Sequence, residues 1–285
     1  MKPAAFDYVV ADSVDAAVAA LGRGDAKIIA GGQSLVPMLN FRLLRPSVLV
    51  DINRIPGLAF IRDDDTSIKI GALARHHQLE TSPVIARHFP VLAEAMRHVA
   101  HLAIRNRGTI GGSLSHADPA AELPMMAMLL DAEMHVARTS GTRTVAARDF
   151  FRDALSVGLG EEEIVIEIVV PKLPPHTGWG FEEVARRSGD FALAAVAVTL
   201  TLSDGTIVQA RIAITGVAPT PRRVTSAESM LVGARLDRGV DDGVIESVRA
   251  VAEPETDLHA SADYRRHLVG VLARRALGAA WRRAA

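Results

Sequence analysis

Two glycine pairs constrain this chain more than any other feature. The first lies in residues 27–37, KIIAGGQSLVP, and the second in residues 104–124, IRNRGTIGGSLSHADPAAELP. Glycine lets the backbone adopt positive φ and lets another group approach it closely. In the first stretch, a buried strand predicted over 27–30 ends at the glycine pair, and a short helix or helical turn is predicted over 34–44. Successive backbone N–H groups in such a turn form a concave site for an anion.

The second stretch carries more chemistry than the first. Pro119 and Pro124 stiffen a loop that brings hydroxyl, imidazole and carboxylate groups beside the glycines: Ser113, Ser115, His116, Asp118 and Glu122. Carboxylates accept hydrogen bonds from ribose hydroxyls, so the two turns together suit a dinucleotide whose pyrophosphate they share. Neither stretch is a G-x-G-x-x-G fingerprint or a P-loop, and two tight strand–helix turns remain the plainer interpretation of the residues alone.

The composition bounds the class of protein. The chain has 285 residues, of which 49% are hydrophobic and 23% charged, which predicts a folded protein of one or a few domains. A formal net charge of −1 gives no global attraction to nucleic acid or to an anionic membrane. The absence of cysteine excludes disulfides, a thiol nucleophile and a cysteine-ligated iron–sulfur cluster in this chain. With no signal-like N-terminus and no apolar run of about eighteen residues, we expect a cytoplasmic protein without a membrane span.

The order of predicted elements indicates an α+β chain with a break near residue 175. The first part is a β-α-β-like unit that includes a helix over 13–22, with Ser13 as its N-cap. The segment 171–180, PKLPPHTGWG, has three prolines and two glycines and is the best candidate for a domain boundary. We therefore predict a first domain over 1–175, with subdomains of about 1–54 and 55–175, and a second domain over 176–285.

Further elements follow the same periodicities. A β-hairpin is predicted within 58–73 around an Asp-rich turn, and a helix over 83–100 has a possible break at Pro90. Residues 163–171 are predicted as a strand. The C-terminal third is predicted to hold two long strands joined by a Ser-Asp-Gly turn, and helices near 224–234, 241–252 and 261–283.

Two patterns of charged or metal-ligating residues have plain structural interpretations. H-x-x-H at 98–101 places two imidazoles on one helical face, but no third ligand is evident, so surface or capping roles are favoured over a metal site. The arginines of 261–283 could form a nucleic-acid patch, but a solvated helix face is favoured. We predict no metal ligands in this chain.

The chain as a whole resembles a known family. The segments AGGQSLVPMLNFRLLRPSVLVDINRI and IRNRGTIGGSLSHADPAAELP, with RRSGDFALAAVAV and SADYRRHLV further on, are similar to the FAD-binding medium subunit of the molybdenum hydroxylases. That family includes carbon monoxide dehydrogenase, nicotine dehydrogenase and xanthine dehydrogenase-type enzymes. The resemblance implies an FAD-binding domain of the vanillyl-alcohol oxidase type, built from two α+β subdomains, followed by a C-terminal α+β domain of the carbon monoxide dehydrogenase flavoprotein type.

The resemblance also implies a set of cofactor-binding residues. Two stretches would wrap the FAD pyrophosphate: Ile28, Ile29, Ala30, Gly31, Gly32, Gln33, Ser34 and Leu35, and then Thr109, Ile110, Gly111, Gly112 and Ser113. Asp118 and Glu122 match positions that contact polar groups of the cofactor, and Ile164 matches an apolar contact near the ring or ribityl chain. Phe191 matches an aromatic position near the isoalloxazine. His116 lies within the same loop, where a hydrogen bond to cofactor or backbone is favoured over metal.

The sequence departs from the family pattern at three places. Gln33 stands where carbon monoxide dehydrogenases typically have His, which argues against carbon monoxide as the substrate without excluding it. Phe191 replaces a Tyr found in many relatives, so ring contact is kept and a hydroxyl hydrogen bond is lost. Glu182 and Glu183 lie where some relatives have Lys, so no cationic flavin contact is expected there.

The implied function is electron transfer. Partner subunits would carry the molybdenum–pterin centre, on a large subunit, and the iron–sulfur clusters, on a small one; the lack of cysteine here agrees with that division. FAD on this chain would take electrons from the clusters and pass them to a quinone, NAD⁺ or oxygen, and no catalytic side chain is expected. The expected assembly is a dimer of heterotrimers in the cytoplasm, which partners could hold at the inner face of the membrane.

Other functions remain open from the sequence. A stand-alone flavin oxidase or dehydrogenase of the same fold would act directly on an organic substrate, but usually needs its own substrate cavity and often a covalent flavin link. A non-catalytic nucleotide-binding or assembly subunit would hold no flavin. A nucleic-acid binder rests only on the C-terminal arginines.

Overall fold

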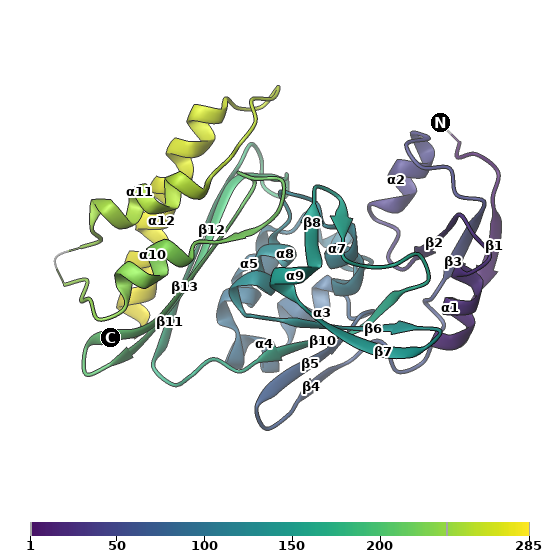
Figure 1. Ribbon diagram of the computed structural model, residues 1–285, viewed down its shortest axis with the longest axis horizontal. Helices are drawn as coiled ribbons and strands as arrows, with labels where there is room; N and C mark the ends of the chain where they lie inside the picture. The colour runs from purple at the N-terminus through teal and green to yellow at the C-terminus, as the bar shows by residue number, and fades with distance from the viewer. Residues whose placement is uncertain (1, 238, 285) are drawn as a thin grey trace.

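The computed structural model describes residues 2–237 and 239–284 as three units along one long axis (Figure 1). The N-terminal unit lies at one end and the C-terminal unit at the other, with a larger middle unit between them. Within the described residues no helix is long and apolar enough to cross a membrane.

The N-terminal unit is a small parallel sheet with one helix packed on it. Its strands are β1 (Asp7–Val10), β2 (Ala26–Ile29) and β3 (Val48–Asp51), in the order β1-β3-β2, and its helices are α1 (Val14–Leu21) and α2 (Leu35–Asn40). The Ser13 hydroxyl accepts a hydrogen bond from the Ala16 N–H and so caps α1, as predicted. Strand β2 ends at Ile29, one residue before the first glycine pair, so this pair lies at the carboxyl edge of the parallel sheet.

The middle unit is an antiparallel sheet covered by helices. Its strands are β4 (Ile61–Asp63), β5 (Ser67–Gly71), β10 (Ile164–Pro171), β6 (Glu133–Arg138) and β7 (Gly141–Ala146), in that spatial order, with β8 (Phe151–Asp153) and β9 (Ser156–Val157) paired separately. Its helices are α3 (His76–Thr81), α4 (Pro83–His88), α5 (Pro90–His98), α6 (Leu102–Arg105), α7 (Ile110–His116), α8 (Glu122–Leu129) and α9 (Ala147–Phe150). The predicted break at Pro90 is confirmed, because α4 ends before Phe89 and α5 begins at the proline.

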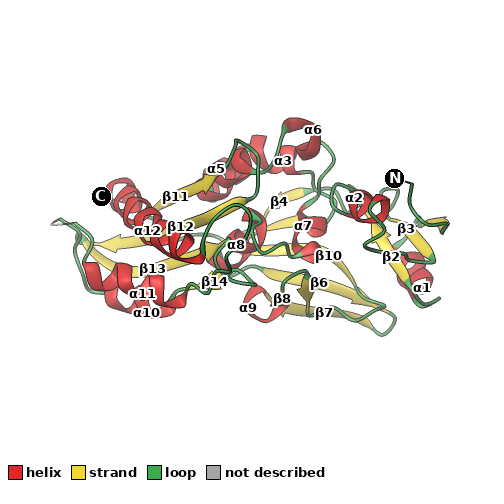
Figure 2. Ribbon diagram, turned by 90° about the horizontal axis from the view of Figure 1, so that it is seen from above, coloured by secondary structure: helices red, strands yellow, loops and turns green. Residues whose placement is uncertain are grey.

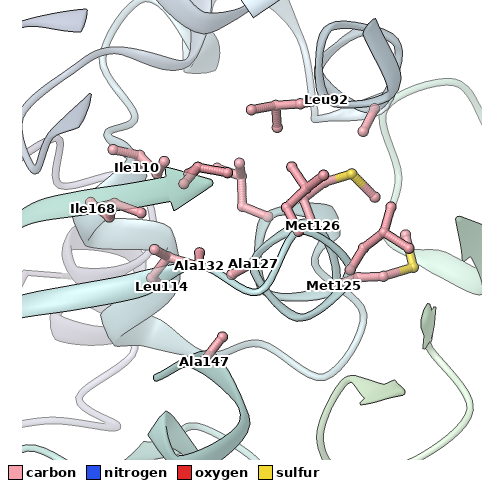
Figure 3. Packing of buried hydrophobic residues seen from close by; sticks show 14 of the residues in the cluster. Leu92, Ile110, Leu114, Met125, Met126, Ala127, Ala132, Ala147 and Ile168 are labelled. Atoms are coloured by element: carbon pink, nitrogen blue, oxygen red, sulfur yellow. The ribbon is translucent and has the colours of Figure 1, made fainter. Parts of the chain in front are cut away.

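The core of the middle unit is aliphatic and rich in methionine. Met125 and Met126 of α8, Leu114 of α7 and Ile168 of β10 pack together with Leu92 of α5 (Figure 3). Unbranched methionine fills irregular gaps that few aromatic residues are available to fill, since aromatics make up only 4% of the chain. This core fixes α7, and with it the second glycine pair, against the sheet.

The C-terminal unit is a sheet with helices on both faces. Strands β11 (Thr177–Ala185), β12 (Ala192–Ser203), β13 (Thr206–Thr215) and β14 (Arg222–Arg223) lie in sequence order, and α10 (Thr225–Leu231), α11 (Asp242–Val251) and α12 (Ala262–Ala284) cover one face. Helices α5 and α8 of the middle unit pack on the other face (Figure 2). All but the last residue of β12 are therefore buried. The sequence predicted β12 and β13 but not β11.

Several arginines of α12 make contacts within the molecule. The buried Arg265 donates to the Leu193 carbonyl at 2.8 Å and to Asp257 at 2.7 Å. The Arg283 guanidinium lies 3.6 Å from the ring centroid of Trp179, and Arg274 pairs with Asp242. The buried Arg265 departs from the predicted solvated helix face, whereas Arg274 and Arg283 lie on the exposed side of the helix, and these internal contacts argue against a nucleic-acid patch.

Candidate cofactor site at the two glycine turns

The two glycine pairs, far apart in sequence, meet in space. The Cα of Gly31 packs against the backbone just before the second pair, so that a Cβ at position 31 would lie 2.2 Å from the Arg107 carbonyl oxygen and 2.9 Å from the Cα of Gly108. Distances under about 3 Å are not tolerated by real side chains. The N-terminal and middle units therefore join at this contact, and only glycine fits position 31.

The first turn presents unpartnered backbone donors. Gly32 has φ of +71°, in the left-handed region, and α2 begins at Leu35 without a side-chain cap from Ser34. Within the described residues, the backbone N–H groups of 32–35 have no hydrogen-bond acceptor. A left-handed residue that turns successive N–H groups to one side is the geometry of an anion-binding concavity. The Gln33 side chain bonds the Gly31 carbonyl at 2.9 Å and so helps to hold this turn.

The second turn differs from the first, because its backbone donors already have acceptors. The Ile110 and Gly111 N–H groups donate to the Ala74 and Ala72 carbonyls at 3.0 and 2.9 Å. The Gly112 N–H donates to the Thr109 hydroxyl at 3.1 Å, which makes Thr109 the N-cap of α7. This turn therefore has no second set of free N–H groups. It offers instead the exposed backbone of Gly112, which a ligand can approach closely because no side chain covers it.

A buried histidine supports the second turn from behind. The His76 ring lies against Gly108, and its Nε2 is 3.0 Å from the Thr109 carbonyl oxygen, to which it donates as the Nε2–H tautomer. Burial lowers the pKa of His76 to about 4, so the ring is neutral at pH 7. The sequence pattern His76-His77 gave no signal for this role, which depends on a contact with a segment more than thirty residues away.

A polar network missed by the sequence connects both turns. The Asn53 amide donates to the Ala30 carbonyl of the first turn at 2.8 Å and accepts from Arg75 at 2.8 Å. Arg75 also donates to the Arg107 carbonyl that abuts the first turn. Asp51 accepts from the Asn53 N–H at 2.8 Å and from the hydroxyl of Tyr8. Although burial opposes it, hydrogen bonds from Tyr8 and Asn53 hold the pKa of Asp51 below its usual value.

Carboxyl groups gather where α8 packs on the C-terminal sheet. Glu122, the first residue of α8, is only 7% exposed. Burial, followed by the nearby Glu183 carboxylate, raises the pKa of Glu122 to about 8. Glu183 of β11 has one buried oxygen without a hydrogen-bond partner and another 3.7 Å from Nδ1 of His98. The sequence singled out Glu122 and did not predict its coupling to Glu183.

The remaining predicted residues lie in different surroundings. Ile164, at the start of β10, is 4% exposed within the cluster that joins the N-terminal unit to the middle unit, so its side chain is covered by protein. Phe191, between β11 and β12, is 65% exposed. His116, at the end of α7, is half-buried, and burial lowers its pKa. Asp118, in the loop between α7 and α8, accepts from the Ala120 N–H at 2.9 Å.

The histidine pair of H-x-x-H has other contacts. The rings of His98 and Phe181 pack at a tilt of 54° with centroids 4.8 Å apart, and Glu183 raises the pKa of His98. His101 precedes α6 as its N-cap residue. Across residues 2–237 and 239–284, no group of three or more histidine, aspartate and glutamate side chains has the geometry to hold a metal ion.

The donor set fits FAD. Free N–H groups at 32–35 match phosphate oxygens, which accept and never donate. The buried Gly31 serves the contact between the two turns, since the Arg107 carbonyl fills its Cβ space, whereas the exposed Gly112 leaves backbone that a ligand can approach. The exposed aromatic ring of Phe191 suits an uncharged, planar part of a dinucleotide, whereas the carboxyl groups of Glu122 and Glu183 are buried in the protein.

Comparison with known proteins agrees with this chemistry. Residues 4–173 match the family described as FAD binding domain in molybdopterin dehydrogenase, and residues 179–280 match the CO dehydrogenase flavoprotein C-terminal domain. The chain is 45% identical to the 6-hydroxypseudooxynicotine dehydrogenase complex subunit alpha of Paenarthrobacter nicotinovorans, covering 100% of this chain and 97% of the relative. It is 39% identical to the carbon monoxide dehydrogenase medium chain of Hydrogenophaga pseudoflava, over 100% of both.

Solved structures show the same fold. Carbon monoxide dehydrogenase from Hydrogenophaga pseudoflava, which lacks the Mo-pyranopterin moiety of its cofactor, superposes with a TM-score of 0.97 at 40% identity over 100% of both chains. Quinoline 2-oxidoreductase from Pseudomonas putida 86 gives a TM-score of 0.93 at 37% identity, over 100% of this chain and 99% of that one. The predicted fold class and the predicted cofactor, FAD, are confirmed. The chain belongs to the family of FAD-carrying medium subunits of the molybdenum hydroxylases, oxidoreductases whose large and small subunits carry the molybdenum–pterin centre and the iron–sulfur clusters.

Proposed function

We propose that the FAD pyrophosphate of this subunit is held at the contact between the two glycine turns. The observation that carries the proposal is the run of free N–H groups at 32–35 directly beside the contact of Gly31 with Arg107. The first turn, from Ile28 to Leu35, donates hydrogen bonds. The second, from Thr109 to Ser113, closes the site with a glycine surface that the Thr109 hydroxyl and the carbonyls of Ala72 and Ala74, just after β5, hold in place.

The rest of the cofactor extends toward the C-terminal unit in this proposal. Phe191 offers its exposed ring to the isoalloxazine. The partly exposed Asp118 and His116 offer polar groups to the linking chain, while the buried Glu122 lies behind them and contributes through its backbone. Ile164 contributes through its backbone, since its side chain is enclosed in a core cluster. The division into domains over 1–175 and 176–285 places these groups on both sides of the link between β10 and β11.

Bound FAD supplies two-electron storage and one-electron exchange. The residues of this chain bind and orient it, exclude water and set its charge environment. We propose that an external quinone, NAD⁺ or oxygen takes the electrons, that the complex is a dimer of heterotrimers, and that it works in the cytoplasm, where partners could hold it at the membrane. Relatives named for carbon monoxide, nicotine and caffeine share 38–39% identity with this chain, which supports a common electron-exit subunit rather than one that selects the substrate.

The rival function is a stand-alone flavin oxidase. Relatives that match almost the whole chain are named as subunits or medium chains, which favours the electron-transfer role. Comparing the purified chain with the reconstituted complex separates the two. The proposal expects the isolated chain to oxidise no organic donor and the complex to reduce its acceptor only when this subunit is present. Full acceptor reduction by the other two subunits alone would contradict it.

A further inference from the structure

Arg75 lies at the junction of the two glycine turns. It follows β5 and precedes α3, and its guanidinium is held from two sides. One terminal nitrogen donates to the Arg107 carbonyl, the same oxygen that abuts Gly31, and the other donates to the Asn53 side-chain oxygen at 2.8 Å. Asn53 in turn donates to the Ala30 carbonyl at 2.8 Å. The guanidinium is therefore one hydrogen bond from the second turn and two from the first.

Among the described residues, no carboxylate contacts this cation directly, although the Asp51 carboxylate lies beyond Asn53 and partly offsets its charge. Across residues 2–237 and 239–284, no carboxylate oxygen lies within 4.0 Å of a guanidinium nitrogen of Arg75 or Arg107. Arg75 is half-buried, and its two described bonds go to neutral oxygens. A guanidinium has five N–H donors, so donors remain for another acceptor. Burial and the neighbouring Arg107 disfavour the charge of Arg75, and the Asp51 carboxylate offsets this only from beyond Asn53, so a bound anion would improve the compensation.

The backbone alone supplies little charge to the site. The first turn offers neutral N–H groups, and the first N–H groups of α7 are bonded to Ala72, Ala74 and Thr109. The pyrophosphate of FAD carries about two negative charges, for which charge-assisted hydrogen bonds are roughly twice as strong as neutral ones. An arginine fork matches phosphate oxygens better than a lysine ammonium does.

We propose that Arg75 is the cationic anchor of the pyrophosphate site, and that Asn53 and the Arg107 carbonyl aim its guanidinium at the contact between the two glycine turns. The inference rests on the proposed pyrophosphate grip and adds to it the source of positive charge. The ligand class is a pyrophosphate-linked nucleotide: FAD, or ADP as its flavin-free fragment.

The test is FAD affinity of the flavin-free full chain, measured by fluorescence titration at low and high salt, with ADP as competitor. Arg75→Gln is expected to weaken both FAD and ADP binding by about 10- to 100-fold at low salt, the loss of one charged hydrogen bond. The deficit should shrink at high salt, where screening weakens the wild-type contact. Arg75→Lys should retain part of the affinity. Arg282→Gln, which removes one exposed charge from α12, should bind as the wild type does.

Several results would overturn the inference. Wild-type affinity in Arg75→Gln would show that the cation does not anchor the ligand. Equal losses in Arg75→Lys and Arg75→Gln, with a salt dependence unchanged from wild type, would show that Arg75 only ties the turns together. If Arg75→Gln does not fold, as judged by circular dichroism, the Arg75→Lys titration and the salt dependence of the wild type decide the question. A wild-type chain that binds no FAD would contradict the pyrophosphate grip itself, whereas a binding wild type with an unaffected variant would contradict Arg75 alone.

Discussion

The Cα of Gly31 and the carbonyl oxygen of Arg107 are so close that a Cβ on residue 31 would lie 2.2 Å from that oxygen. The atoms that this Cβ would meet belong to the backbone of Arg107 and Gly108, which cannot rotate away as a side-chain tip can. Gly31→Ala must therefore push the two turns apart. We expect FAD affinity to fall at least about 10-fold, because both sides of the phosphate site move.

Gly278 provides the matched control for this substitution. It lies within α12, and a Cβ there meets only the flexible guanidinium of Arg282 at 3.4 Å. Gly278→Ala should leave FAD affinity unchanged and stabilise the chain by about 0.5–1 kcal/mol, the usual gain from alanine in a helix. Fluorescence titration and thermal unfolding of both variants check the pair. Unchanged FAD binding in Gly31→Ala would mean that the contact between the turns is not part of the site.

Phe191 should affect the flavin and not the fold. Its ring is 65% exposed, so Phe191→Ala removes little buried surface and should change the melting temperature of the flavin-free chain by no more than about 1–2 °C. If the ring contacts the isoalloxazine, the variant should bind FAD more weakly and quench its fluorescence less. Phe191→Tyr should keep the quenching. Identical flavin spectra and affinity in Phe191→Ala would remove Phe191 from the site.

Glu122 should make the flavin-free chain less stable as the pH rises. The unfolded chain ionises this group near its ordinary pKa of 4.5, whereas the folded chain holds the proton up to a pKa of about 8. Between these values the unfolded state releases a proton that the folded state keeps, so the free energy of unfolding decreases as the pH rises through this window. Burial is the main cause of the raised pKa of Glu122, and the nearby carboxylates of Glu183 and Asp118 add to it.

Glu122→Gln removes this dependence while keeping the shape of the side chain. The free energy of unfolding is measured with urea at pH 5, 7 and 9. Relative to the wild type, the free energy of the variant should increase at each step, by up to a few kcal/mol in total. The comparison uses the change with pH and not the absolute stability, so a constant offset from repacking does not matter. Parallel pH profiles for the two proteins would show that Glu122 is ionised in the folded chain.

His76 should give the opposite dependence at lower pH. Burial holds its pKa near 4 in the folded chain, against 6.5 for an ordinary histidine, so the unfolded chain binds a proton first as the pH falls. The contribution of the neutral His76 ring to the free energy of unfolding is complete above pH 6.5 and is lost as the pH falls toward 4. In the background of Glu122→Gln, the additional variant His76→Gln should flatten the urea-unfolding profile between pH 6.5 and 4. A slope that survives the second substitution would assign it to other groups.

Local patterns in the sequence predicted elements whose causes are local. The helix over 13–22 has its cap and its apolar face within ten residues, and the break at Pro90 follows from a single side chain. Strand β11 was missed because its sequence, TGWGFEEVA, contains two glycines and two adjacent glutamates and lacks clear alternation. The structure explains the glycines: a Cβ at Gly178 or Gly180 would lie 2.0 Å from a carbonyl oxygen of α12.

In the candidate site too, the sequence predicted the local motifs but not the contacts between distant segments. Both glycine turns were evident as motifs, but their different use of backbone N–H groups depends on Ala72 and Ala74, which lie more than thirty residues before α7. The link from Asn53 through Arg75 to Arg107 joins three segments that no periodicity connects. The coupling of Glu122 to Glu183 likewise exists only because α8 packs on the C-terminal sheet.

The most direct test of the account is an absorbance spectrum of the purified chain, followed by acid release and mass analysis of the cofactor. The account predicts the bands of oxidised flavin and the release of intact FAD, or, for a chain purified without cofactor, recovery of those bands when FAD is added. It also predicts that Gly31→Ala retains less FAD than the wild type at the same FAD concentration, once unbound FAD is removed. A colourless wild-type chain that does not take up added FAD would contradict the claim that the two glycine turns form a pyrophosphate site.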